Sequence, residues 1–100
     1  MRRIVWSPQA AATYRREILD SLDQGEAALR RVRDDIERTI EVLAERPIGR
    51  PGRIAGTYEK STAGRPYVIT YGLLTRTNGE ADDVLILQIR AALRLSLIHI

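Results

Sequence analysis

The side chains with the clearest chemical potential are cationic and lie in the second half of the sequence. Lys60, Arg65, Arg90 and Arg94 could each contact a phosphate or a carboxylate. Cleavage of RNA by attack of a ribose 2′-hydroxyl would also require a general acid and a general base beside such cations. No complete set of this kind is visible, so we assign no catalytic residue. These four residues are predicted to bind a target.

Other reactive residue types occur singly. His99 is the only histidine and lies in the closing "LSLIHI", where a passive surface role is expected. Ser7 resembles a helix cap, and Ser61 resembles a turn residue. Tyr58, Tyr67 and Tyr71 could stack on bases, but tyrosines at alternating strand positions are more often part of a core. No cluster has metal-ligand spacing and no glycine-rich loop opens a helix, so neither a metal nor a cofactor is predicted.

The length and composition indicate one small folded domain. With 100 residues, 44% hydrophobic and 29% charged, the chain has a globular balance. We expect the domain to span residues 1–95 and residues 96–100 to form a tail of unclear role. No apolar run approaches the ~20 residues of a membrane helix, and the basic N-terminus does not continue as a signal peptide. The chain contains no cysteine, and cytoplasm is the expected location.

The net charge of +3 is unevenly distributed. Residues 1–45 carry a net charge of −1, and residues 46–100 carry +4. A basic surface of this kind attracts acidic partners, whether nucleic acid or an acidic peptide. The alternative is that the chain is simply rich in arginine, since Lys60 is its only lysine.

Two amphipathic helices are predicted in the first half. Ser7-Pro8 resembles an N-cap followed by proline at the first helical position. The first helix should bury Ala11, Tyr14, Ile18 and Leu22, which recur at spacings of three and four. The second helix should span residues 26–46 and end before Pro47. Its apolar stripe is Leu29, Val32, Ile36, Ile40 and Leu43.

Four strand-like runs complete the pattern, at residues 2–6, 52–61, 65–75 and 82–91. The junction at 46–60 is rich in proline and glycine, which turns the chain from helix to sheet. Gly56 lies inside a strand pattern and suggests a bulge or a close backbone approach. Asn78-Gly79 indicates a hairpin turn. The predicted fold class is α+β, with an N-terminal strand and a helical hairpin on one face of a mainly antiparallel four-stranded sheet.

Strict alternation along the last two strands divides their side chains between two faces. The helix-facing set is predicted to be Tyr67, Ile69, Tyr71, Leu73, Leu85, Leu87 and Ile89. The outer face is predicted to be an open groove, floored by Val68, Thr70, Gly72, Val84, Ile86, Gln88 and Arg90. Because exposed apolar strips mark partner sites, this groove is a candidate binding surface.

These motifs occur in an order that resembles a known family. A helical hairpin is followed by "LAERPIGRPGRIAGTYE" at 43–59, "PYVITYGL" at 66–73 and "VLILQIR" at 84–90. The pattern is similar to the ParE branch of the RelE/ParE toxins of bacterial toxin–antitoxin modules, and it covers residues 3–91. The resemblance implies the fold derived above. It also implies a cytoplasmic toxin, of the kind found in plasmid-stabilisation modules, held inactive by a cognate antitoxin.

The resemblance further implies partners and surfaces. The antitoxin would be ParD-like, of the ribbon-helix-helix type, and would form a hetero-oligomer with this chain. Any contact of the complex with DNA would be made by the antitoxin. It would bind the outer groove at Val68, Thr70, Val84, Ile86 and Gln88. The target of a ParE-type toxin would be DNA gyrase, inhibited by binding rather than by catalysis.

Two alternatives remain. RelE-type relatives cut messenger RNA on the ribosome, and they carry an arginine where this chain has Val68 and basic residues where it has Ala91-Ala92. The gyrase-directed hypothesis is therefore favoured over the endoribonuclease. The closing residues also depart from the ParE pattern, which keeps a third hypothesis open: a non-toxic or degenerate interaction domain.

Overall fold

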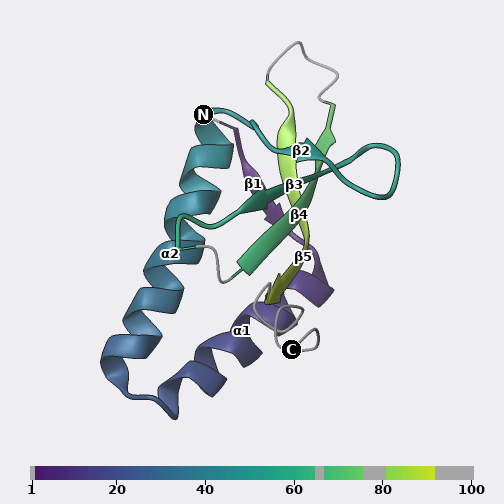
Figure 1. The fold of residues 1–100 in the computed structure, drawn as a ribbon. Helices are drawn as coiled ribbons and strands as arrows, with labels where there is room; N and C mark the ends of the chain where they lie inside the picture. The colour runs from purple at the N-terminus through teal and green to yellow at the C-terminus, as the bar shows by residue number, and fades with distance from the viewer. Residues whose placement is uncertain (1, 65–66, 76–80, 92–100) are drawn as a thin grey trace, which may run out of the picture.

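The computed structural model describes residues 2–64, 67–75 and 81–91. In this part of the chain, two helices pack on one five-stranded mixed sheet with the strand order β1-β5-β4-β3-β2 (Figure 1). The elements are β1 (Ile4–Trp6), α1 (Pro8–Leu22), α2 (Glu26–Glu45), β2 (Arg50–Pro51), β3 (Thr57–Ser61), β4 (Tyr67–Leu74) and β5 (Asp83–Ala91). The predicted α+β class is confirmed. The additional strand is β2, which has only two residues.

The helix boundaries follow local capping chemistry. The Ala10 amide donates to Ser7 Oγ at 3.0 Å, and Pro8 occupies the first turn, so the predicted start of α1 is confirmed. Gly25 precedes α2 with φ of 101°, a conformation that glycine adopts without strain. α2 ends at Glu45, one residue before the predicted boundary. None of the helices in the described ranges is long and apolar enough to cross a membrane.

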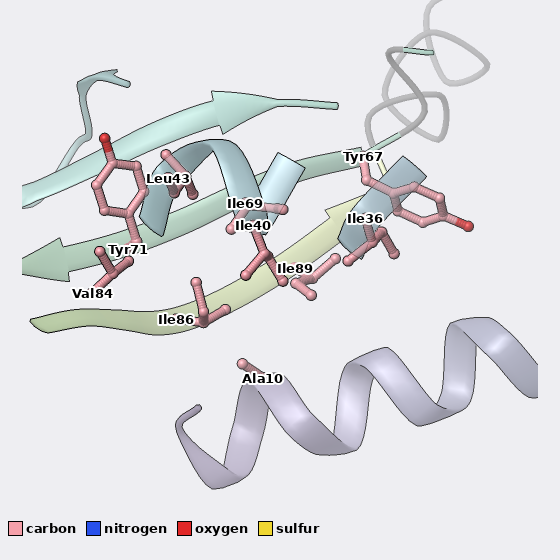
Figure 2. Close-up of a cluster of buried hydrophobic side chains, with 10 residues drawn as sticks. All are labelled: Ala10, Ile36, Ile40, Leu43, Tyr67, Ile69, Tyr71, Val84, Ile86 and Ile89. Carbon is pink, nitrogen blue, oxygen red and sulfur yellow. The ribbon is translucent and has the colours of Figure 1, made fainter. Parts of the chain in front are cut away.

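The core lies between α2 and the strand pair β4–β5 (Figure 2). Ile36, Ile40 and Leu43 of α2 are buried there, as their spacing predicts. They contact a set from the sheet and α1 that comprises Tyr67, Ile69, Tyr71, Val84, Ile86, Ile89 and Ala10. Since each fully buried aliphatic side chain contributes about 1.5–3 kcal/mol, this layer supplies most of the hydrophobic stabilisation.

α1 buries a stripe that is shifted from the one predicted, although the predicted Tyr14 does pack against the core, partly buried. Its buried residues are Ala10, Glu17 and Ser21, whereas Leu22 is 48% exposed. The stripe is displaced because small Ala10 packs into the core and Glu17 accepts a hydrogen bond from Tyr67 Oη at 3.4 Å. Apolar periodicity could not find a buried stripe that is partly polar.

A β-bulge on β5 corrects the predicted outer face. Thr70 pairs with Gln88, but Tyr71 pairs with Ile86, so Leu87 is the extra residue. Strict alternation therefore fails at Leu87. Val84 and Ile86 are fully buried in the core, not exposed on the outer groove as predicted.

The segment between α2 and β3 is held close to the sheet by glycines. The Gly49 amide donates to Tyr71 Oη at 2.7 Å, and a Cβ at Gly49 would lie 2.6 Å from the Glu59 carbonyl oxygen. Gly56 has φ of 85° and belongs to the turn before β3, not to a strand interior as predicted. The predicted turn at Asn78-Gly79 lies outside the described residues.

We predict that Ile36→Ala lowers the free energy of unfolding by about 2–5 kcal/mol, because it leaves a cavity in the centre of the core. Leu19→Ala is the matched control: Leu19 is 66% exposed on α1, and its truncation should cost no more than about 0.5 kcal/mol. Urea denaturation measures both. Equal losses in the two variants would show that α2 does not face the core as described.

We also predict a loss of stability at alkaline pH. Burial is the main reason that the pKa of Tyr71 is raised above its ordinary value of 10.0. A group whose pKa is raised by folding contributes stability below its unfolded pKa and loses it as the pH rises through the folded value. Denaturation midpoints should therefore fall above about pH 10. Tyr71→Phe should flatten this decline, and an unchanged slope would contradict the assignment.

Candidate partner-binding site

A groove of about 520 Å³ lies on the face of the sheet opposite the core. We call it the outer groove. The start of α1, the β2–β3 loop and strands β3, β4 and β5 all contribute to its walls. Its lining residues are Ser7, Gln9, Arg53, Ile54, Thr57, Glu59, Thr70, Leu87, Gln88 and Arg90.

Strand pairing explains why these side chains share a face. Glu59 pairs directly with Thr70, and directly opposite residues in an antiparallel sheet project to the same side. The bulge then allows consecutive residues, Leu87 and Gln88, to line the same groove. Gly72 pairs with Thr57 and has no side chain, so no side chain projects from this position of β4.

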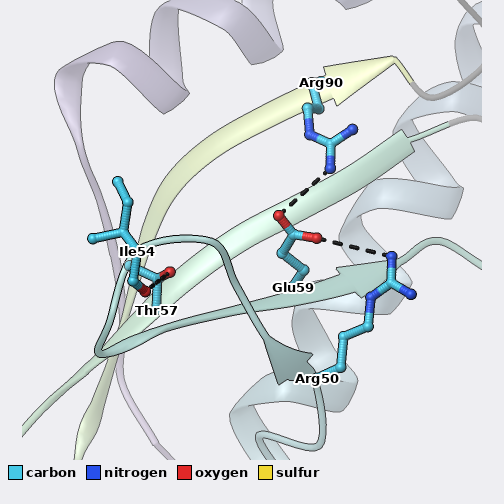
Figure 3. Close-up of polar contacts among 5 residues, drawn as sticks. All are labelled: Arg50, Ile54, Thr57, Glu59 and Arg90. Atoms are coloured by element: carbon cyan, nitrogen blue, oxygen red, sulfur yellow. Dashed lines mark hydrogen bonds and ion pairs between the residues drawn. The ribbon is translucent and has the colours of Figure 1, made fainter. Parts of the chain in front are cut away.

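Glu59 organises the charges of the outer groove (Figure 3). Its carboxylate lies 3.5 Å from an Arg90 guanidinium nitrogen and 3.9 Å from one of Arg50. The Glu59 side chain is only 15% exposed, whereas that of Arg50 is 75% exposed. Each pair contributes at most about 1 kcal/mol to stability at such separations. Their main effect is to offset part of the positive charge that arginines bring to this face.

The β2–β3 loop forms the outer wall of the groove. Thr57 donates its hydroxyl and its amide to the Ile54 carbonyl, at 2.6 and 3.1 Å (Figure 3 shows the first bond). These bonds hold a turn whose Ile54 side chain is 73% exposed. An exposed isoleucine beside hydroxyl, amide and guanidinium groups gives a surface that can bind a segment with both apolar and acidic side chains.

Ser7 already has structural partners. Its Oγ accepts from the Ala10 amide and donates to the Leu87 carbonyl at 3.1 Å, so it links α1 to the bulge. No group of three His, Cys, Asp or Glu suited to a metal ion occurs within the ranges that the structure describes.

The sequence-predicted partner residues are only partly brought together. Thr70, Gln88 and Arg90 line the outer groove, as expected. Val68 projects to the same side as its pairing partner Arg90, but it is 5% exposed and is not among the lining residues. Val84 and Ile86 lie in the core, so the reason for assigning them to an open groove no longer holds.

The four predicted target-binding cations do not form one described cluster. Lys60 pairs with Ile69, which faces the core, so it lies on the helix side of the sheet, away from Arg90. Arg65 and Arg94 lie outside the described residues, as does His99. Sequence reasoning missed Arg53 and Glu59 as parts of the outer groove, although both stand in the proline- and glycine-rich junction that indicated a turn.

A further hollow of about 660 Å³ lies between the two helices and the β3–β4 connection. Glu17, Asp20, Asp34 and Asp35 line it together with Arg31 and Arg38. Because Asp35 Oδ1 accepts from the Gly64 amide at 3.2 Å and Glu17 accepts from Tyr67, some of these carboxylates serve the fold itself.

Comparison with known proteins identifies solved structures that have a similar fold. Neither a protein-family model nor a curated protein matches the chain. Solved structures do match, among them the following two. The chromosomal ParDE TA system from P. aeruginosa has a TM-score of 0.72 at 21% identity, over 91% of this chain and 96% of that one. The YoeB/ParE toxin from Agrobacterium tumefaciens has a TM-score of 0.59 at 18% identity, over 89% and 97%. The chain therefore has the ParE-type toxin fold that its sequence motifs indicate.

Proposed function

We propose that this protein is the toxin of a bacterial type II toxin–antitoxin module and is neutralised by a ParD-like antitoxin in a cytoplasmic hetero-oligomer. The observation that carries the proposal is the match to a ParDE system along nearly the whole of both chains. The order of the motifs between residues 43 and 90 supports it independently. The antitoxin, as a ribbon-helix-helix protein, would make any contact with DNA.

The outer groove is the proposed antitoxin site. Thr70 and Gln88 offer hydrogen bonds there, Ile54 offers exposed apolar surface, and Arg53 and Arg90 offer positive charge. A segment with apolar anchors and acidic flanks complements this combination. Apolar contacts would supply much of the affinity, and the arginines would mainly accelerate association.

DNA gyrase is the proposed target, bound rather than chemically modified. Lys60 and Arg90 remain candidates for that contact, but they project to opposite sides of the sheet. One flat target surface would not reach both. Target binding through both residues therefore requires a partner that wraps around the open edge of the sheet.

A ribosome-dependent endoribonuclease is the second candidate, and one observation favours it. Glu59 places a carboxylate within 3.5 Å of the Arg90 guanidinium in an open groove. A carboxylate can act as a general base, and a guanidinium can stabilise a phosphorane-like transition state. The same two groups also suit an acidic peptide, so experiment must decide between them.

Expression of the chain alone should arrest bacterial growth, and co-expression of its antitoxin should relieve the arrest. The purified toxin should inhibit supercoiling by gyrase and leave messenger RNA intact in a translating extract. Cleavage of messenger RNA would establish the second candidate. If growth is unimpaired although folded protein is present in the cell, the remaining hypothesis is a non-toxic interaction domain.

Glu59→Gln separates the two candidates in one variant. For a binding-type inhibitor, the change removes one negative charge from the outer groove, so association with an acidic antitoxin segment should become faster and more salt-dependent. Growth arrest should persist. For a nuclease that uses Glu59 as its base, cleavage should fall by about 100-fold or more. Stopped-flow binding and the extract assay measure the two outcomes.

Ile54→Asp tests the antitoxin site itself. A charge at this exposed apolar position should weaken the complex at least about tenfold, because the carboxylate would be desolvated against the bound segment. Leu19→Asp is the control, since Leu19 is similarly exposed but lies on α1. Calorimetric titration compares them. If Leu19→Asp weakens binding and Ile54→Asp does not, the antitoxin binds the helical hairpin instead.

A further inference from the structure

A second groove, of about 650 Å³, lies on the helix side of the sheet between α2 and the end of β3. We call it the edge groove. Val42 is 38% exposed and Ile48 is 59% exposed, and both line it. Lys60, Ser61, Thr62 and Ala63 form its opposite wall. No residue is shared with the lining of the outer groove.

Among residues 2–64, 67–75 and 81–91, the sheet edge beside this groove has no neighbouring strand. β2 pairs only with Tyr58 and Glu59, so β3 continues beyond its neighbour. The Gly52 amide donates to the Thr57 carbonyl, which therefore points toward β2, whereas the Thr62 amide donates to the Tyr67 carbonyl across β4. Because strand residues alternate in direction, the amide and carbonyl of Ser61 point away from β4. They face the side where β2 is absent.

The part of the chain that the structure describes does not complete this edge. Continuing the β2–β3 register would place Ile48 opposite Ser61. The Ile48 amide instead donates to the Arg46 carbonyl at 2.9 Å. In addition, the buried Thr62 hydroxyl has no hydrogen-bond partner in the part of the chain that the structure describes. The end of β3 thus carries polar groups that the described fold leaves unused.

The charge of the edge groove is one-sided. Of the described side chains that line it, the charged ones are Arg38 and Lys60, and both are cationic. This contrasts with the outer groove, where Glu59 offsets the arginines. The edge groove therefore favours an acidic occupant with an apolar side that covers Val42 and Ile48.

We propose that the edge groove binds an extended, acidic segment of a partner protein, which adds to β3 as an antiparallel strand. Its residue opposite Ser61 would exchange two backbone hydrogen bonds with Ser61. That residue's side chain would project to the outer face, as the side chain of Ser61 does. Gly49 already occupies the position opposite Lys60, so the segment would extend from Ser61 toward Thr62. Its next residue in that direction would point toward Val42 and Ile48 and should be apolar. Acidic residues at either end would lie near Arg38 and Lys60. The proposal rests on the geometry of this edge and does not require the toxin assignment, although Lys60 is shared with the proposed target contact.

The test uses the full chain and a short synthetic peptide in which valine alternates with threonine and aspartates flank both ends. NMR titration should map binding to Lys60, Ser61 and Val42. The Ser61 amide should exchange with solvent at least about tenfold more slowly when the peptide is saturating, because strand addition gives it a hydrogen-bond acceptor. A scrambled peptide of the same composition should neither bind nor protect this amide.

Three variants make the test specific. Ile48→Asp should weaken peptide binding at least about tenfold, and Ser61→Pro should do the same by removing the outward amide at an edge where proline is tolerated. Ile54→Asp is the matched control, an exposed isoleucine on the outer groove that should leave peptide binding unchanged. An unprotected Ser61 amide, or equal binding by wild type and Ile48→Asp, would overturn the proposal. Since Ile54→Asp reports on the antitoxin site, failure of one proposal is distinguishable from failure of the other.

Discussion

The structure depends on one contact, the packing of the α2 stripe against β4 and β5. Ile36, Ile40 and Leu43 cover the strand pair, and the Tyr71 ring extends this layer toward the segment that follows α2. Through its hydroxyl, Tyr71 fixes Gly49, which in turn sets where β2 begins to pair with β3. Both grooves are defined by elements held in this way. The outer groove uses the far side of the same strands, and the edge groove uses the space left where β2 ends.

Much of the fold could be predicted from the sequence because its signals are local. The α2 stripe and the Ser7-Pro8 start need only helical periodicity and capping chemistry. The faces of β5 could not be predicted, because a bulge depends on pairing between strands and Leu87 has no distinctive residue type. The α1 stripe was predicted only in part, through Tyr14, since Glu17 and Ser21 are polar. The outer groove was therefore located on the correct face through Thr70, Gln88 and Arg90, but with the wrong apolar floor.

The two sides of the sheet offer different chemistry to partners. On the outer side, Glu59 lies between two arginines, so an incoming acidic group would have to compete with an internal carboxylate. On the edge, Arg38 and Lys60 have no such competitor among the lining residues that the structure describes. For a partner that binds both surfaces, the affinity of the contact at the edge groove would consequently fall more steeply with salt concentration than that of the contact at the outer groove.

The position of β1 has a consequence for biosynthesis. Within the described residues, β1 joins the sheet by parallel pairing with β5 alone, from Ile4 opposite Val84 to Trp6 opposite Ile86. The Arg3–Asp83 ion pair at 2.8 Å reinforces this junction. A nascent chain still lacking β5 has no partner for β1 and no Val84 or Ile86 for its core. Contacts between residues so far apart in the sequence form slowly compared with a helix. The sheet therefore becomes complete only after the residues through β5 have been synthesised and have left the ribosome, so binding by way of this sheet is a late event in the life of each copy.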